Sequence, residues 1–152
     1  MNTETKNLVC QAESRYLTPE ELGLFANNIK SMPQRLSLYK LLRDREVKIV
    51  QTVANQIEAQ MPKADPKTLE LGIKNLLLVM RYCAMAILTD NPALLKTRLL
   101  DWLEQVTTMY EMQGVNATLY QLLSQVLKNE LTSEQLSLLQ PLIDTARSTL
   151  VG

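Results

Sequence analysis

Residues 72–82 read Gly72-Ile73-Lys74-Asn75-Leu76-Leu77-Leu78-Val79-Met80-Arg81-Tyr82, and this stretch decides the fold. It belongs to a segment that Asp65-Pro66 opens, because aspartate is a favoured N-cap and proline has the right φ for the first helical position. From there apolar side chains recur every three or four positions, at Leu69, Ile73, Leu76, Met80, Cys83 and Ile87. This spacing predicts an amphipathic helix with one buried stripe.

The same signals predict helices before this segment. A short helix is expected over about residues 4–14, and Thr18-Pro19-Glu20-Glu21 forms a capping box that starts a second one. Pro33 is expected to end this second helix near Ser31, because proline disfavours helical geometry in the residue before it. A new helix is then expected from about Gln34 to Gln60, with a buried stripe of Leu42, Ile49, Val50, Val53 and Ile57.

Helices are also predicted after the central segment. Asn91-Pro92 opens one, and Gly114 is expected to stop it as a left-handed C-cap. Its expected buried face is Leu95, Leu99, Trp102, Val106 and Met109. Asn116 is expected to cap the next helix, with Leu119, Leu122, Leu123 and Val126 inside, and Thr132-Ser133-Glu134-Gln135 is a second capping box. Pro141 should kink the last helix, whose buried face is Leu136, Leu139, Ile143, Ala146 and Leu150. The prediction is an all-α fold in one domain, residues 1–152, whose helix lengths suit a globin-type globule.

Composition narrows the function classes. Lys+Arg and Asp+Glu both number 16, and this balance argues against a nucleic-acid footprint and a polybasic membrane anchor. The chain has no histidine, so histidine-ligated haem or zinc and Ser-His or Cys-His catalysis are excluded. We expect no catalytic site and no metal site. The longest apolar run, Leu76 to Leu88, is interrupted by Arg81 and is too short to span a bilayer. Cys10 and Cys83 are expected to be free thiols in a reducing compartment, and Cys83 to be a core thiol, which predicts a cytosolic protein.

Three segments together resemble the phycobiliprotein family. Arg15-Tyr16-Leu17-Thr18-Pro19-Glu20-Glu21-Leu22 is similar to the family's Arg-Tyr-Leu-Ser-x-x-Glu-Leu segment. Arg45-Glu46-Val47-Lys48-Ile49-Val50 is similar to a charged stretch ending in Ile-Val on a main helix of the family. Residues 72–82 resemble its bilin-attachment helix, which opens Cys-x-Arg-Asp and carries an Arg-Tyr pair at the same distance. The resemblance implies a globin-like phycobiliprotein fold, an N-terminal helical extension over about residues 1–32, and a cyanobacterial or plastid setting.

The resemblance assigns a modified bilin site. Gly72 stands where the family has the cysteine that forms the thioether, so no covalent cofactor is expected. Lys74 replaces the arginine that pairs with a bilin propionate, and Asn75 replaces the aspartate that accepts from pyrrole nitrogens. Arg81 and Tyr82 complete the candidate pocket. Two interpretations stay open: a weak, non-covalent bilin pocket, or a pocket that has decayed and left Lys74 as a solvated helix residue.

The family's subunit contact is a second implied feature. There an acidic residue ahead of the Arg-Tyr-Leu-Ser segment pairs with an arginine across the dimer. Gln11 occupies the best-aligned position, and Glu13 lies two residues further on. We therefore predict a homodimer, or a dimer with a phycobiliprotein-like partner, in which Glu13 meets Arg81 and Arg15 lies at the interface. The alternative that stays open is that Glu13 and Arg81 are unrelated surface charges.

Two functional hypotheses follow. The first is a non-enzymatic globin that binds or handles a linear tetrapyrrole (bilin) non-covalently and assists bilin biosynthesis beside the enzymes of that pathway. The chain is similar in this respect to the bilin biosynthesis-associated globins, which lack the attachment cysteine. The alternative is a pigment-free interaction or assembly subunit associated with the phycobilisome. Either hypothesis implies the cyanobacterial cytosol or the plastid stroma, with association to thylakoids left open.

Overall fold

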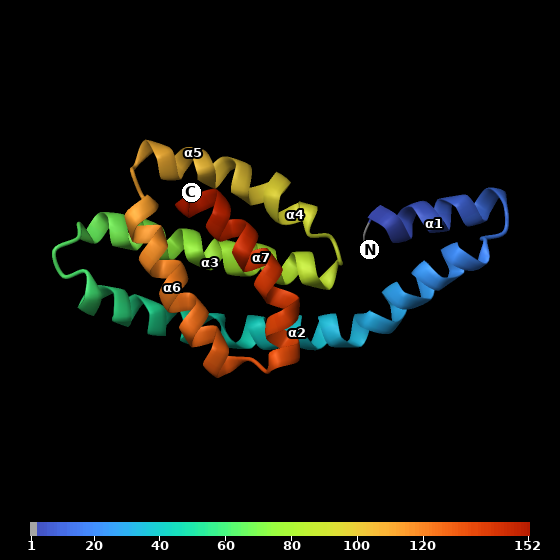
Figure 1. Ribbon diagram of the computed structural model, residues 1–152, viewed down its shortest axis with the longest axis horizontal. Helices are drawn as coiled ribbons and strands as arrows, with labels where there is room; N and C mark the ends of the chain where they lie inside the picture. The colour runs from blue at the N-terminus through green and yellow to red at the C-terminus, as the bar shows by residue number, and fades with distance from the viewer. Residues whose placement is uncertain (1–2) are drawn as a thin grey trace.

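The computed structural model describes residues 3–152, and its regular elements in that range are all helices (Figure 1). In chain order they are α1 (Thr3–Ser14), α2 (Pro19–Gln60), α3 (Pro66–Leu88), α4 (Ala93–Leu95), the π-helical turn η1 (Lys96–Leu100), α5 (Asp101–Met109), α6 (Gln113–Glu130) and α7 (Ser133–Val151). The predicted all-α class is confirmed. Residues 1 and 2 of the predicted N-terminal extension lie outside the described range.

The predicted helix boundary at Pro33 is wrong, because α2 runs through it as one helix of 42 residues. The capping box at its start is confirmed: the Glu21 amide donates to Thr18 Oγ1 at 3.2 Å, and the Thr18 amide donates to the Glu21 carboxylate at 3.0 Å. An internal proline removes one backbone hydrogen bond and tends to bend a helix, but it does not have to end it.

Arg35 explains why α2 continues through Pro33. This buried guanidinium donates to Ser31 Oγ at 3.1 Å and to the Asn28 carbonyl oxygen at 2.8 Å, so it ties the turn after Pro33 to the turns before it. It also donates to the Leu88 carbonyl oxygen at 2.8 Å, which lies at the end of α3. Hydrogen bonds from a charged donor are among the stronger ones in proteins. Arg35 thus clamps both halves of α2 to the end of α3.

The N-terminal part of the chain forms an arm beside the globular body. We use "the arm" for α1 together with α2 as far as Met32. In Figure 1 α1 folds back along the first half of α2, and this pair projects away from the other helices. Leu8 is buried in this contact, and the Asn28 amide donates to Thr5 Oγ1 at 2.9 Å. The arm is therefore held to the body through the continuous α2.

The core of the body is built around α3, which packs against α2, α4, α6 and α7. The stripes predicted for α2 and α3 are buried, with Ile73 only partly so. The α3 helix is long and apolar enough to cross a membrane by length and composition. Its apolar composition has a simpler explanation, because a helix packed on several sides in a core is hydrophobic around most of its circumference.

The buried face predicted after Leu99 is wrong at Trp102 and Met109, whereas Val106 is partly buried. Trp102 and Met109 are exposed, by 55% and 73%, whereas Leu103 and Thr107 are buried. The cause is η1, because a π-helical turn accommodates one more residue than an α-helical turn and rotates everything after it. The expected spacing of three and four residues therefore points to the wrong side of α5.

The predicted boundary between the next two helices is also wrong. Gly114 does not stop a helix but lies in the first turn of α6, and Asn116 is buried inside α6 rather than capping it. The left-handed position of this turn is taken by Glu111, with φ of 52°. Asn116 instead donates to Thr107 Oγ1 at 3.3 Å and to the Leu150 carbonyl oxygen at 3.1 Å. Its polar side chain is satisfied within the core, which links α6 to α5 and α7.

The start of α7 agrees with its prediction. The Gln135 amide donates to Thr132 Oγ1 at 3.2 Å, and the Thr132 amide donates to the Gln135 side chain at 3.0 Å. Pro141 lies inside the helix, which continues to Val151. The predicted buried face of α7 is confirmed except at Leu136, which is partly exposed.

Candidate functional site

Gly72 lies in a tightly packed place between α3 and α6. It is buried, and a Cβ atom at this position would lie 2.8 Å from Leu119 Cδ1 and 3.2 Å from Val115 Cγ1. Carbon atoms in contact are normally 3.5–4.0 Å apart. The direction in which a cysteine side chain would point is therefore filled by side chains of α6, and glycine lets the two helices approach.

Lys74 lies on the outer side of α3 and already has a partner. Its ammonium is 3.0 Å from the carboxylate of Glu70, one turn earlier on the same helix. Both side chains are largely exposed, at 69% and 65%. Exposed pairs of this spacing contribute little to stability, so Lys74 can exchange this partner for another at small cost.

The other three candidate residues do not join Lys74 in one site. Asn75 is buried and makes no side-chain hydrogen bond to another residue of the described range 3–152. Tyr82, which is partly buried, lies seven residues on and therefore shares a face with Asn75, not with Lys74. Arg81 is exposed and binds the Glu46 carboxylate of α2 with contacts of 3.0–3.3 Å. The pair with Glu46 raises the pKa of Arg81 through hydrogen bonding and charge attraction.

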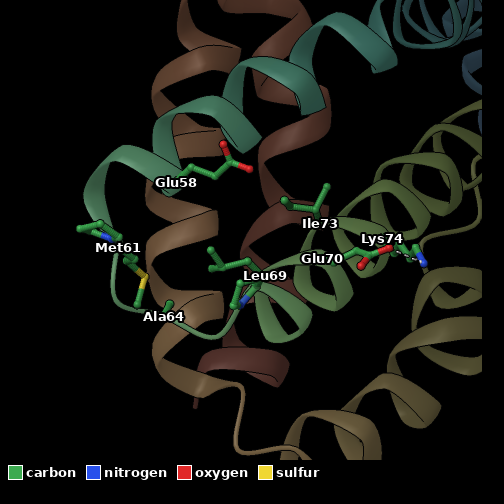
Figure 2. A pocket seen from close by; sticks show the side chains of 9 residues that line it. Glu58, Met61, Ala64, Leu69, Glu70, Ile73 and Lys74 are labelled. Carbon is green, nitrogen blue, oxygen red and sulfur yellow. Dashed lines mark ion pairs between the residues drawn. The ribbon is translucent and has the colours of Figure 1, made fainter.

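A pocket of about 720 Å³ lies at the corner where α2 turns into α3, and Lys74 is on its rim (Figure 2). Its apolar lining comes from the turn and from α3: Met61, Pro62, Ala64, Pro66, Leu69 and Ile73. Its charged lining is Glu58 on α2 and the Glu70–Lys74 pair on α3. We call this the corner pocket. It is a shallow and largely open hollow with a mostly apolar lining, and its volume falls within the range of small-molecule sites.

The sequence indicated only Lys74 of this pocket. The turn between α2 and α3 is short, from Met61 to Asp65, and a short turn gives no sequence signal of a binding site. One signal was available, because Glu70 and Lys74 are four residues apart and such residues meet on a helix surface. Glu58 carried no comparable signal, since nothing in the sequence shows that α2 and α3 meet at this corner.

Neither cysteine replaces the missing attachment residue at Gly72. Cys83 is fully buried in the core, and burial raises the pKa of its thiol to about 12. A thiol in this state is protonated and inert at neutral pH. Cys10 is an exposed free thiol on α1, in the arm. Among residues 3–152 no group of three or more cysteine, aspartate or glutamate side chains is arranged to hold a metal ion.

The predicted contact residues of the arm are engaged within the chain. Arg15 donates to both oxygens of Glu21 at 2.9 and 3.0 Å and to the Tyr16 carbonyl oxygen at 3.0 Å. The hydrogen bond from Arg15 is the main reason that the pKa of Glu21 falls to about 2. Glu13 is exposed and has no ion pair with any residue that the structure describes. Of the three residues predicted for the interface, Glu13 is the one without a charged partner among the described residues 3–152.

Comparison with known proteins now decides the family. A family model described as "Phycobilisome protein" matches residues 8–150. The chain belongs to the phycobilisome protein family. Its helical body with the preceding arm is the globin-like phycobiliprotein fold. No curated protein gives a significant match to the chain. Phycobilisome proteins are generally structural light-harvesting proteins, not enzymes, which typically carry covalently bound bilins and assemble with similar subunits.

Proposed function

We propose that this chain is a non-enzymatic phycobiliprotein-like globin that holds a linear tetrapyrrole non-covalently in the corner pocket. The observation that carries this proposal is the apolar-lined pocket beside Lys74, in a member of a family that typically binds bilins. The packing around Gly72 supports a mode of binding without the thioether, because the usual attachment position has no free space.

The chemistry of the pocket fits such a ligand. A bilin is flat and largely apolar, and Met61, Leu69 and Ile73 offer apolar contacts to its rings. Its propionates are anionic, and the Lys74 ammonium can pair with one of them, although without the two-pronged geometry of an arginine. Asn75 and Tyr82 face another side of α3. They take part only if the ligand extends around the helix.

A visible-absorption titration of the purified protein with a linear bilin tests this function. We expect a saturable, red-shifted and sharpened band for the wild type, weakened in Lys74→Ala. Lys128→Ala is the matched control, because Lys128 is an exposed-face lysine of α6 away from the corner pocket. The absence of any spectral change with the wild type contradicts the proposal.

We further propose, on the basis of this bilin binding, that the protein assists bilin biosynthesis. A protein that holds a bilin reversibly suits transfer of that bilin to or from a biosynthetic enzyme in the cyanobacterial cytosol or plastid stroma. A bilin reductase assay with and without the protein tests this role, since a carrier changes the rate of product release. An unchanged rate at saturating protein argues against it.

The arm supports a second candidate, a pigment-free interaction subunit of a phycobilisome-type assembly. Leu22, Ile29 and Met32 are exposed apolar residues spaced along one side of α2 in the arm, and Leu36 continues this stripe just beyond it. Such a stripe on a projecting helix is typical of a surface that another subunit covers. We propose that a second copy or a phycobiliprotein-like partner docks here, with Glu13 meeting Arg81 once Arg81 leaves Glu46.

Light scattering coupled to size exclusion tests this contact. Ile29→Asp is expected to shift an oligomer towards the monomer. Met109→Asp is the control, because Met109 is an exposed apolar residue of α5, outside the arm. Arg81→Glu tests the predicted ion pair with Glu13 separately. An oligomer that is unchanged by Arg81→Glu removes that pair from the proposal, and one unchanged by Ile29→Asp removes the arm.

A further inference from the structure

The corner pocket holds its one cation in an internal ion pair. The Lys74 ammonium is bound to Glu70, and both residues line the pocket. Figure 2 shows the dashed pair on α3, with Glu58 reaching from α2 on the other side of the pocket. The pocket therefore carries two carboxylates and one ammonium, and its rim is net negative.

This charge arrangement affects how tightly an anionic ligand binds. A ligand carboxylate that pairs with Lys74 must compete with the carboxylate of Glu70, which is already 3.0 Å from the ammonium. Glu70 can yield easily, because its side chain is 65% exposed and water can solvate it after it moves. Glu58 has no ion pair within residues 3–152 and does not compete for Lys74.

We propose that Glu70 is a built-in competitor that lowers the affinity of the corner pocket for carboxylate-bearing ligands by a small factor. In this exchange the ligand carboxylate takes the place of the Glu70 carboxylate at Lys74, and Glu70 turns to solvent. The inference rests on the proposed function and adds a specificity-determining residue to it. A ligand without a carboxylate gains nothing from displacing Glu70.

The variant Glu70→Gln tests the exchange, since it keeps the size of the side chain and removes its charge. We expect a bilin with free propionates to bind about two- to threefold more tightly to this variant, in line with the modest strength of exposed i,i+4 pairs. Glu58→Gln is the matched control, because it removes a negative charge from the same pocket without touching the partner of Lys74. Its effect should be smaller than that of Glu70→Gln.

Two further measurements separate exchange from a general change in the pocket. The gain should vanish in the double variant Glu70→Gln/Lys74→Ala, and it should vanish when the ligand is the dimethyl ester of the same bilin. A gain that persists in either case, or no gain at all, overturns the role of Glu70 while bilin binding by the wild type stands. No binding of the free bilin to the wild type and to either single glutamate variant overturns both the inference and the proposed function.

Discussion

Replacing Gly72 by alanine measures how closely α3 and α6 are packed. The new Cβ would lie 2.8 Å from Leu119 Cδ1, so Leu119 must retreat by about 0.7 Å to reach an ordinary contact. Leu119 is 1% exposed and has little room to move. Overpacking of this kind costs about 1–3 kcal/mol, and the loss of a helical glycine returns about 0.5–1 kcal/mol. We expect a net destabilisation of about 1 kcal/mol, and a larger one for Gly72→Cys.

Thermal unfolding followed by circular dichroism is the assay. A change of 1 kcal/mol shifts the Tm of a domain of this size by about 2–4 °C. Gly23→Ala is the control, because Gly23 is inside α2 with no atom within 4 Å of its new Cβ, and we expect it to raise the Tm. The destabilisation caused by Gly72→Ala should be smaller in a Leu119→Val background. If Gly72→Ala raises the Tm as Gly23→Ala does, the packing argument is refuted.

Three further predictions concern other parts of the chain. Arg35→Ala should destabilise the protein by about 1–3 kcal/mol in urea unfolding, because it removes a buried guanidinium that bonds the partly buried carbonyl oxygens of Asn28 and Leu88. A loss below about 0.5 kcal/mol contradicts the clamp. The pKa of Glu21 is lowered to about 2, so its pair with Arg15 stabilises the arm fully above about pH 4.5 and loses its effect as the pH falls towards 2. Hydrogen exchange of the arm amides at pH 6, 4 and 2.5 should show protection that falls within this window and stays constant above it. Trp102, the single tryptophan, should show solvent-exposed emission that acrylamide quenches readily, and a blue-shifted, protected emission argues against the observed register of α5.

Much of the fold could be read from the sequence where local signals act alone. The capping boxes at Thr18 and Thr132 start α2 and α7, because the hydrogen bonds involved span only three residues. The apolar spacing of α3 correctly predicts its buried stripe, since an uninterrupted α-helix keeps the same period throughout. The resemblance carried by residues 72–82 led to the family that residues 8–150 confirm.

The failures arise where a distant contact decides a local structure. Pro33 is a helix-ending signal by itself, but Arg35 reaches back across it and over to the end of α3. The π-helical turn before α5 has no marker in the sequence, so the regular helical period wrongly predicts Trp102 on the buried side. The corner pocket forms where two helices meet at a short turn. This meeting brings Glu58 and Glu70 together although no sequence motif contains them.

The continuity of α2 makes the arm an extension of a helix that packs in the body, with Pro33 at the junction. The part of α2 before this proline spans roughly 21 Å at ~1.5 Å per residue, so a bend of about 10° there moves the tip by about 4 Å. A displacement of that size at the tip separates side chains that would otherwise be in contact with a neighbouring subunit. The angle of α2 at Pro33 would thus determine the curvature of any array built through the arm. Substitutions around Arg35 would change the shape of such an assembly while every residue of its contact surface stays the same.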